Sequence, residues 1–161
     1  METLLEELFN QAGLEINAWE RASLARHWRL LYAANQQFNL TAIQEDALAA
    51  EKHYLDSLLP LAQLREAAGG RQALLADIGS GGGLPALPLA ICLPDFSFTL
   101  LEATGKKCAF LAERVEKLAL ANVSVRKLRA EEAGRDPALR AGFDFVTARA
   151  VARLPVLLEY A

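Results

Sequence analysis

The pattern of apolar and turn-forming residues changes near residue 72, and this change constrains the fold more than any other feature. Beyond it, four short apolar runs bounded by turn residues are typical of buried strands: 73–78, 97–102, 122–127 and 143–148. Helical periodicity occupies 85–92 and 106–118, and Pro85 suits a first helical turn. Strands that alternate with helices predict parallel βαβ units in an α/β doubly wound sheet.

The first 70 residues are predicted to be helical and to form a cap. Apolar residues recur at helical spacing after Thr3 and Asn17, and each of these has a glutamate three residues later, which fits a capping box. The second helix is expected to end near Asn35, and a third to run over 52–64. The glycine-containing run 66–72 predicts a boundary between a cap over 1–70 and a sheet domain over 71–161.

Composition and charge narrow the class of protein. No apolar run reaches the ~20 residues of a membrane helix, and the acidic start lacks the features of a signal peptide. Cys92 and Cys108 lack metal-ligand spacing, so we expect no metal and reduced thiols in a cytoplasmic protein. The net charge is −3, but residues 1–102 carry −7 (6 basic, 13 acidic) and 103–161 carry +4 (11 basic, 7 acidic). This asymmetry favours an anionic partner for the second half, or is a chance feature of a solvated surface.

Four glycines follow the first predicted strand in ADIGSGGGLPALPLA (76–90), where a doubly wound sheet binds ligands. A P-loop needs a lysine after its glycines and none follows, whereas Leu84 replaces the third glycine of a dinucleotide fingerprint and weakens that alternative. The remaining pattern, D-x-G-x-G-x-G, resembles the S-adenosyl-L-methionine loop of Rossmann-like methyltransferases. Backbone N–H groups suit the ligand's carboxylate, and an acid suits its ammonium, directly or through water. A tight turn without a ligand is the alternative. The residues of this pattern are Asp77, Gly79, Gly81 and Gly83.

Two acidic features support a nucleoside ligand. Glu102 ends the second predicted strand, 23 residues after Gly79, and an acid about 20 residues beyond such a loop typically accepts hydrogen bonds from ribose hydroxyls. The stretch RAEE (129–132) follows the third strand, where an adenine would lie in this sheet order. Taken alone, each is also compatible with a solvated strand end or a surface turn. Together with the loop they predict a nucleoside cofactor.

Six segments, in order along the chain, carry a resemblance to a known family: FNLTA (38–42), HYLDSL (53–58), ADIGSGGGLPALPLA (76–90), LLEATGKKCAFL (100–111), RAEE (129–132) and FDFVTARAVA (143–152). In these segments the chain resembles the small-subunit ribosomal RNA methyltransferase G family, also called glucose-inhibited division protein B. The resemblance implies a Rossmann-like class I methyltransferase fold, with a truncated sheet of order 3-2-1-4 and an N-terminal helical cap. Family members continue past Ala161, so the fourth strand is expected to be an exposed edge. Ala86 stands where the family usually has glycine.

The resemblance also implies the reaction. A methyl group would pass from S-adenosyl-L-methionine to N7 of a guanine in 16S rRNA, free or within the 30S subunit, leaving S-adenosyl-L-homocysteine. We expect a monomer with no membrane or metal partner. Besides the four residues of the loop pattern, the predicted cofactor-binding residues are Leu84, Glu102, Ala103, Thr104, Ala130, Glu131 and Arg149. The predicted RNA-binding residues are Asn39, His53, Lys106, Lys107 and Arg153.

The chemistry of N7 explains why no catalytic residue is predicted. This ring nitrogen has a lone pair and no proton, so it needs no general base, and the enzyme's task is positioning. Signatures of other methylations are missing: no [DNS]-P-P-[YF] string follows the fourth strand, and both cysteines lie earlier than a C5 nucleophile would.

Several alternatives remain open at this stage. Arg149 contacts cofactor or target base, or it pairs with a cap carboxylate such as Asp56, and His53 binds substrate or is an ordinary structural histidine. The chain as a whole is a methyltransferase or a non-catalytic RNA- or nucleotide-binding module. A dinucleotide-binding oxidoreductase is disfavoured by Leu84.

Overall fold

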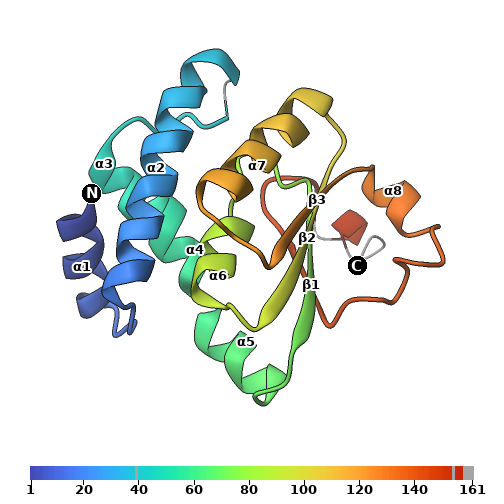
Figure 1. The fold of residues 1–161 in the computed structure, drawn as a ribbon, viewed down its shortest axis with the longest axis horizontal. Helices are drawn as coiled ribbons and strands as arrows, with labels where there is room; N and C mark the ends of the chain where they lie inside the picture. The colour runs from blue at the N-terminus through green and yellow to red at the C-terminus, as the bar shows by residue number, and fades with distance from the viewer. Residues whose placement is uncertain (39, 154, 158–161) are drawn as a thin grey trace.

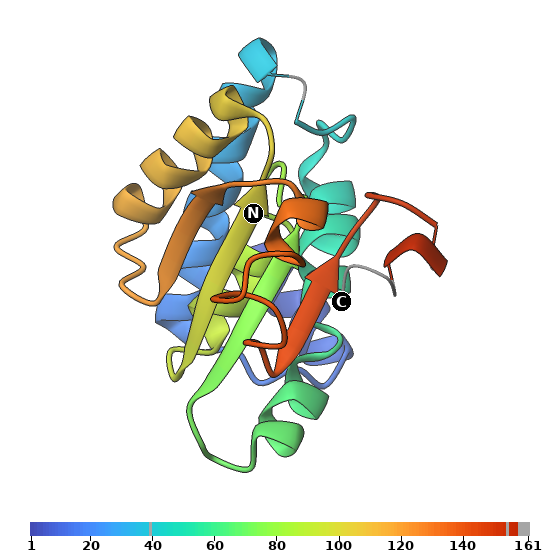
Figure 2. The ribbon, with the colours of Figure 1, turned by 90° about the vertical axis from the view of Figure 1, so that its right-hand side faces the viewer.

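The structure is a computed structural model that describes residues 1–38, 40–153 and 155–157. Its centre is a parallel sheet of order β3-β2-β1-β4 (Figures 1 and 2), formed by β1 (Ala73–Ile78), β2 (Phe96–Glu102), β3 (Val123–Lys127) and β4 (Phe145–Ala148). The predicted strands and their order are confirmed, with ends that differ by one or two residues. Among the described strands β4 is an edge, as expected.

Helices cover the two faces of the sheet unequally. One face carries α6 (Ala86–Cys92) and α7 (Gly105–Lys117), whereas the short α8 (Ala130–Ala133) lies on the other (Figures 1 and 2). Every residue of α6 is buried, because this helix is enclosed between the sheet and the cap. The carboxyl ends of all four strands point to the same edge, where the loops after β1, β2 and β4 meet.

The cap packs outside α6 and α7 (Figure 1). Its elements are α1 (Glu2–Gln11), α2 (Ala18–Phe38), α3 (Asp46–Ala49), the π-helical η1 (Ala50–Leu55), α4 (Asp56–Leu58) and α5 (Leu61–Ala68). The capping box of α2 is confirmed: Glu20 N–H donates to Asn17 Oδ1 (2.9 Å) and Asn17 N–H donates to Glu20 Oε2 (2.7 Å). The box at Thr3 is wrong, because α1 already begins at Glu2.

The predicted helix over 52–64 is also wrong. A continuous helical stretch starts at Asp46 and ends at Leu58, and a separate helix follows Pro60. Proline has no N–H and its ring collides with the preceding turn, so a helix cannot run through this position unbroken. The second helix continues to Phe38, three residues beyond the expected end.

A single apolar cluster extends from the cap into the sheet. Leu5, Leu24 and Leu58 of the cap belong to the same cluster as Leu75 and Leu100 of the sheet, and all five are 0% exposed. The cap therefore shares its core with the sheet, and the division near residue 70 stays a prediction. No helix in the described ranges has the length and apolarity to cross a membrane.

The cap core contains a buried hydrogen bond between two side chains. His27 is fully buried, and its Nδ1 lies 2.8 Å from the Tyr54 hydroxyl, with the two rings edge to face. Burial lowers the pKa of His27 to about 3, so the ring is neutral at physiological pH. The phenol therefore gives His27 a neutral hydrogen-bond partner inside the core.

We expect Tyr54→Phe to lower the free energy of unfolding by about 1–3 kcal/mol, because it leaves a buried ring nitrogen without a partner. Urea denaturation measures the change. Tyr32→Phe, which removes the hydroxyl of a 42% exposed tyrosine, is the control and should stay within about 0.5 kcal/mol of the wild type. Equal losses in the two variants would contradict a special role for this pair.

Candidate functional site

The glycine-rich loop connects β1 to α6 at the carboxyl edge of the sheet. Gly79, Gly81 and Gly83 have φ angles of 67°, 50° and 87°, which an L side chain rarely adopts. A Cβ at Gly83 would also collide with the Leu87 side chain, and one at Gly79 would lie 2.7 Å from Val151 Cγ2. The positive φ angles favour glycine at all three positions, and close packing adds to this requirement at Gly79 and Gly83.

The end of β2 holds this loop in place. The carbonyl oxygen of Leu101 accepts hydrogen bonds from the N–H groups of Gly79 (2.9 Å) and Ser80 (3.2 Å). Gly83 N–H in turn donates to the Ser80 carbonyl oxygen (2.6 Å). The N–H groups of Gly79, Ser80 and Gly83 are thus already hydrogen-bonded within the protein. These groups hold the conformation of the loop and are not free donors for a ligand.

Glu102 braces the same loop with its side chain. It is 6% exposed, its Oε2 accepts from Gly81 N–H (3.0 Å) and its Oε1 accepts from Thr104 N–H (2.8 Å). The sequence suggested a ribose contact or a solvated strand end for Glu102 and gave no sign of this structural role. Each carboxylate oxygen can accept a further hydrogen bond, so the predicted ribose contact is compatible with the bracing.

Asp77 places a carboxyl group beneath the loop. It is 1% exposed, and its Oδ1 accepts from the Thr147 hydroxyl of β4 (2.7 Å). Its Oδ2 is buried and has no hydrogen-bond partner among the described residues. Burial raises the pKa of Asp77 from 3.8 to about 7, although the hydroxyls of Ser80 and Thr147 and the positive charge of Arg149 oppose the rise. A buried acceptor of this kind suits a cationic group.

Arg149, directly after β4, turns toward the cap. Its Nη1 donates to the Lys52 carbonyl oxygen (3.1 Å) and lies 3.6 Å from Asp56 Oδ2, while its Nη2 lies 3.4 Å from His53 Nδ1. The pairing with Asp56, one of the two alternatives at the sequence level, is therefore present. A cofactor contact of Arg149 stays a prediction.

Several other predicted residues lie around the same edge. Ala103, Thr104 and Lys106 are exposed in the loop after β2 and the first turn of α7, Lys107 is half-buried, and Arg153 is exposed after β4. Asn39 lies outside the described residues. Thr147, which pairs with Asp77, was missed, and its position near the end of the fourth predicted strand was the available signal.

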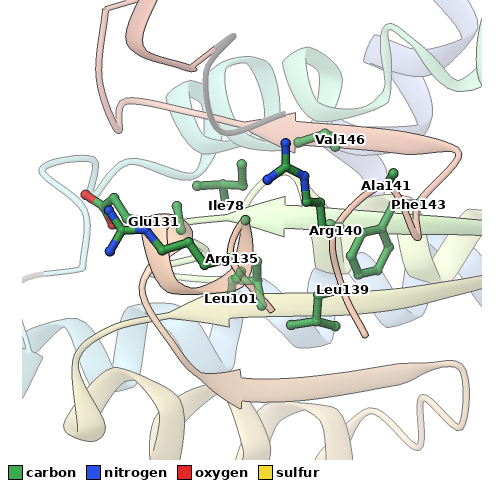
Figure 3. A pocket seen from close by; sticks show the side chains of 13 residues that line it. Ile78, Leu101, Glu131, Arg135, Leu139, Arg140, Ala141, Phe143 and Val146 are labelled. Carbon is green, nitrogen blue, oxygen red and sulfur yellow. The ribbon is translucent and has the colours of Figure 1, made fainter. Parts of the chain in front are cut away.

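A pocket of about 590 Å³ lies under α8, on the sheet face opposite α6 and α7 (Figure 3). Ile78, Leu101 and Val146 form its apolar floor, and Arg135 and Arg140 stand at its side. Of the predicted cofactor residues only Ala130 and Glu131 line it. The glycine loop, Asp77 and Glu102 do not line this pocket, so it is distinct from the edge where the other predicted residues gather. Within the described ranges, no group of three or more His, Cys, Asp or Glu residues could hold a metal ion.

A solved structure from Klebsiella pneumoniae, described as a candidate O-methyltransferase, has a TM-score of 0.59 to this chain. The match covers 97% of this chain and 64% of that chain at 19% identity, so it concerns the fold alone. The sheet order, the glycine loop and this likeness define a Rossmann-like class I methyltransferase fold.

Sequence comparisons identify the family. The family model of the rRNA small subunit methyltransferase G proteins (GidB) matches residues 20–161, and the chain belongs to this family. The ribosomal RNA small subunit methyltransferase G of Sorangium cellulosum is 50% identical over 146 residues, which are 91% of this chain and 60% of that protein. The protein of the same name from Chloroflexus aggregans is 44% identical over 160 residues, 99% of this chain and 66% of that protein. The chain thus spans between 60 and 66% of the length of these relatives.

The raised pKa of Asp77 predicts a pH-dependent stability. The unfolded chain releases this proton near pH 3.8, whereas the folded chain keeps it up to about pH 7, so the contribution of Asp77 to the free energy of unfolding falls across that window. We expect the free energy of unfolding of Asp77→Asn to rise relative to that of the wild type by up to roughly 4 kcal/mol between pH 4 and 7. This figure corresponds to about three pKa units at 1.4 kcal/mol each.

Urea denaturation of both proteins at several pH values between 4 and 8 measures this difference. Asp95→Asn, at an exposed position, is the matched control and should show no such divergence from the wild type. If the free energies of unfolding of the wild type and Asp77→Asn differ by the same amount at every pH, burial does not keep this carboxyl group protonated.

Proposed function

We propose that this chain carries the cofactor site of an S-adenosyl-L-methionine-dependent methyltransferase that acts on N7 of a guanine in 16S rRNA. The observation that carries the proposal is the buried carboxyl group of Asp77 beneath a loop of three positive-φ glycines. Its Oδ2 has no hydrogen-bond partner in the described part of the chain. Family membership supports the choice of rRNA as the substrate class.

The residues of the carboxyl edge fit this cofactor. Its amino-acid part carries an ammonium, for which Asp77 offers an acceptor directly or through water. Gly81 leaves its backbone open to close approach, because the nearest atom to an added Cβ is the Gly79 carbonyl oxygen at 3.7 Å, and the oxygens of Glu102 can accept from ribose hydroxyls. Leu84, Ala103, Thr104, Ala130, Glu131 and Arg149 complete the proposed cofactor set.

The proposed reaction needs no general base from the side chains. The cofactor, when bound, supplies an electrophilic methyl group on a sulfonium. Guanine N7 has an in-plane lone pair and no proton to lose, so this chain needs no general base. What it must do is hold the base at a fixed distance and angle, and misplacement by about 1 Å costs on the order of 100-fold in rate.

Charge at this edge suits an RNA partner. Lys106 and Lys107 begin α7, the Lys127 ammonium lies close to Gly105, and Arg153 is exposed after β4. Phosphate contacts of this type make binding weaken steeply with salt. We include Asn39 and His53 in the proposed RNA side of the site, and we place the protein in the cytoplasm as a monomer without a metal.

Calorimetric titration with S-adenosyl-L-homocysteine tests the cofactor site. We expect Gly81→Val to weaken binding by more than about 100-fold, because a side chain at φ 50° distorts the loop floor. Gly13→Val is the matched control: Gly13 has φ 69°, nothing lies within 4 Å of its added Cβ, and it is far from the loop in the sequence. Its affinity should equal that of the wild type, and unchanged affinity in Gly81→Val would remove the loop from the site.

The same titration with NAD separates the classes of ligand. Binding of NAD without any response to S-adenosyl-L-homocysteine would overturn the proposal in favour of a dinucleotide-binding domain.

Methyl transfer from labelled cofactor to naked 16S rRNA and to 30S subunits tests the reaction. We expect label at N7 of one guanine in at least one of the two substrates. Label on an exocyclic amine would reject the N7 assignment. Cofactor and RNA binding without any transfer would identify a non-catalytic binding module.

A further inference from the structure

His53 joins the end of the sheet to the cap through both of its ring nitrogens. Arg149 Nη2 lies 3.4 Å from His53 Nδ1, and Thr41 Oγ1 lies 2.8 Å from His53 Nε2. A guanidinium can only donate, so Nδ1 is the acceptor and a neutral ring carries its proton on Nε2. In this tautomer the hydrogen bonds run in one direction: Arg149 donates to His53, and His53 donates to Thr41.

Thr41 is held on several sides at once. Its hydroxyl oxygen also accepts from Ile43 N–H (3.0 Å). Asn35, at 7% exposure on α2, donates from Nδ2 to the Thr41 carbonyl oxygen (2.8 Å) and accepts from Thr41 N–H at Oδ1 (2.8 Å). Together, these bonds fix both the backbone and the side chain of one residue in an otherwise irregular segment.

The segment that contains Thr41 stands against the glycine loop. A Cβ built on Gly82 would lie 3.8 Å from Leu40 Cβ and 3.9 Å from the Leu40 carbonyl oxygen. Leu101 and Glu102 of β2 supply hydrogen bonds to the first part of the glycine loop. The cap packs against the loop at Gly82, where an added Cβ would lie 3.3 Å from Leu31 Cδ1. The segment 40–43, which we call the wall, thus lies beside the glycine loop of the proposed cofactor site. Its position depends on the hydrogen bonds that Thr41 makes.

The other contacts of Arg149 and His53 secure this connection. Arg149 also binds the Lys52 carbonyl oxygen and pairs with Asp56. His53 is 6% exposed, and burial together with the positive charge of Arg149 lowers the pKa of its ring to about 4, against smaller opposing effects of the Lys52 carbonyl and Asp56. The ring is therefore neutral, and it bridges its two partners without titrating near neutral pH.

We propose that His53 is a positioning residue that fixes the wall 40–43 relative to the end of β4, by accepting from Arg149 and donating to Thr41. This proposal rests on the proposed function, because the wall matters only if a base is placed beside the cofactor. It also changes the role of His53, which acts on the target base through Thr41 and not by touching RNA.

Two substitutions at His53 separate its two hydrogen bonds. His53→Asn keeps an acceptor near the Nδ1 position but has no atom that reaches Thr41, whereas His53→Gln keeps a donor near the Nε2 position. We expect His53→Asn to lower kcat for methyl transfer by about 10- to 100-fold, and His53→Gln to stay within about threefold of the wild type. The dissociation constant of S-adenosyl-L-homocysteine should change little in both variants, because the hydrogen bonds to Gly79, Ser80 and Gly81 come from β2 and not from His53.

Substitutions at Thr41 test whether His53 acts through this residue. Thr41→Val should reproduce the loss in kcat, Thr41→Ser should restore it, and the double variant His53→Asn/Thr41→Val should be no worse than Thr41→Val alone. Lys52→Ala is the control, because it keeps the backbone carbonyl that Arg149 binds and removes only an exposed ammonium that pairs with Glu51. Equal losses in His53→Asn and His53→Gln, or additive losses in the double variant, would overturn the proposal. A fall in melting temperature and cofactor affinity with kcat unchanged would overturn it too.

A spectroscopic readout is independent of turnover. The chain has only two histidines, so the ¹⁵N signals of the His53 ring can be assigned by their loss in His53→Asn. We expect a neutral ring protonated on Nε2 from pH 5 to 8, and a changed Nε2 signal in Thr41→Val. A ring protonated on Nδ1 would refute the proposed donation from Arg149 to His53 and from His53 to Thr41. If the wild type transfers no methyl group, the proposed function fails while this measurement still decides whether Arg149 and Thr41 hold the ring.

Discussion

The paired hydrogen bonds from Gly79 and Ser80 to the Leu101 carbonyl oxygen are the interaction on which the rest of the site depends. They exist because β1 and β2 lie parallel and in a register that pairs Ile78 with Leu101, so that the chain leaving β1 turns across the end of β2. The Glu102 carboxylate then fastens Gly81 one step further along. A shift of the strands by one residue would move all three contacts together. The shape of the loop is therefore a consequence of strand register as well as of its glycines.

The buried carboxyl group of Asp77 is costly for the fold, and this cost indicates where function is located. A lone carboxylate cannot stay charged in a site that is 1% exposed, so it remains protonated to about pH 7. Thr147 satisfies one oxygen and leaves the other without a partner among the described residues. A cation placed near the free oxygen would lower the pKa of Asp77, release its proton and remove the cost. Strongly perturbed groups of this kind concentrate at functional sites.

The sequence was sufficient for the elements that local pattern determines. Short apolar runs bounded by turn residues located β1 to β4, and the glycine spacing located the loop. Where the apolar pattern continued across a proline, as it does around Pro60, periodicity outweighed the backbone signal and the predicted helix was wrong. Contacts between distant residues were harder to predict: Thr147 meets Asp77 only because β4 lies beside β1, 70 residues later in the chain. The pairing of Arg149 with Asp56 stood as one of two alternatives, because charge suggested it and nothing local could select it.

The cap and the sheet meet at the site through two different kinds of contact. Far from the carboxyl edge they share an apolar core, which adds stability but has little directional preference. At the edge they meet through Arg149, His53 and Thr41, whose hydrogen bonds have fixed directions and specify one relative position. Hydrogen bonds of this kind contribute modestly to net stability. A misplaced target base, by contrast, would strongly lower the rate of the proposed methyl transfer. The polar contacts are thus concentrated where placement matters more than stability. The proposed methyl transfer, which depends on alignment and needs no general base, would require this arrangement.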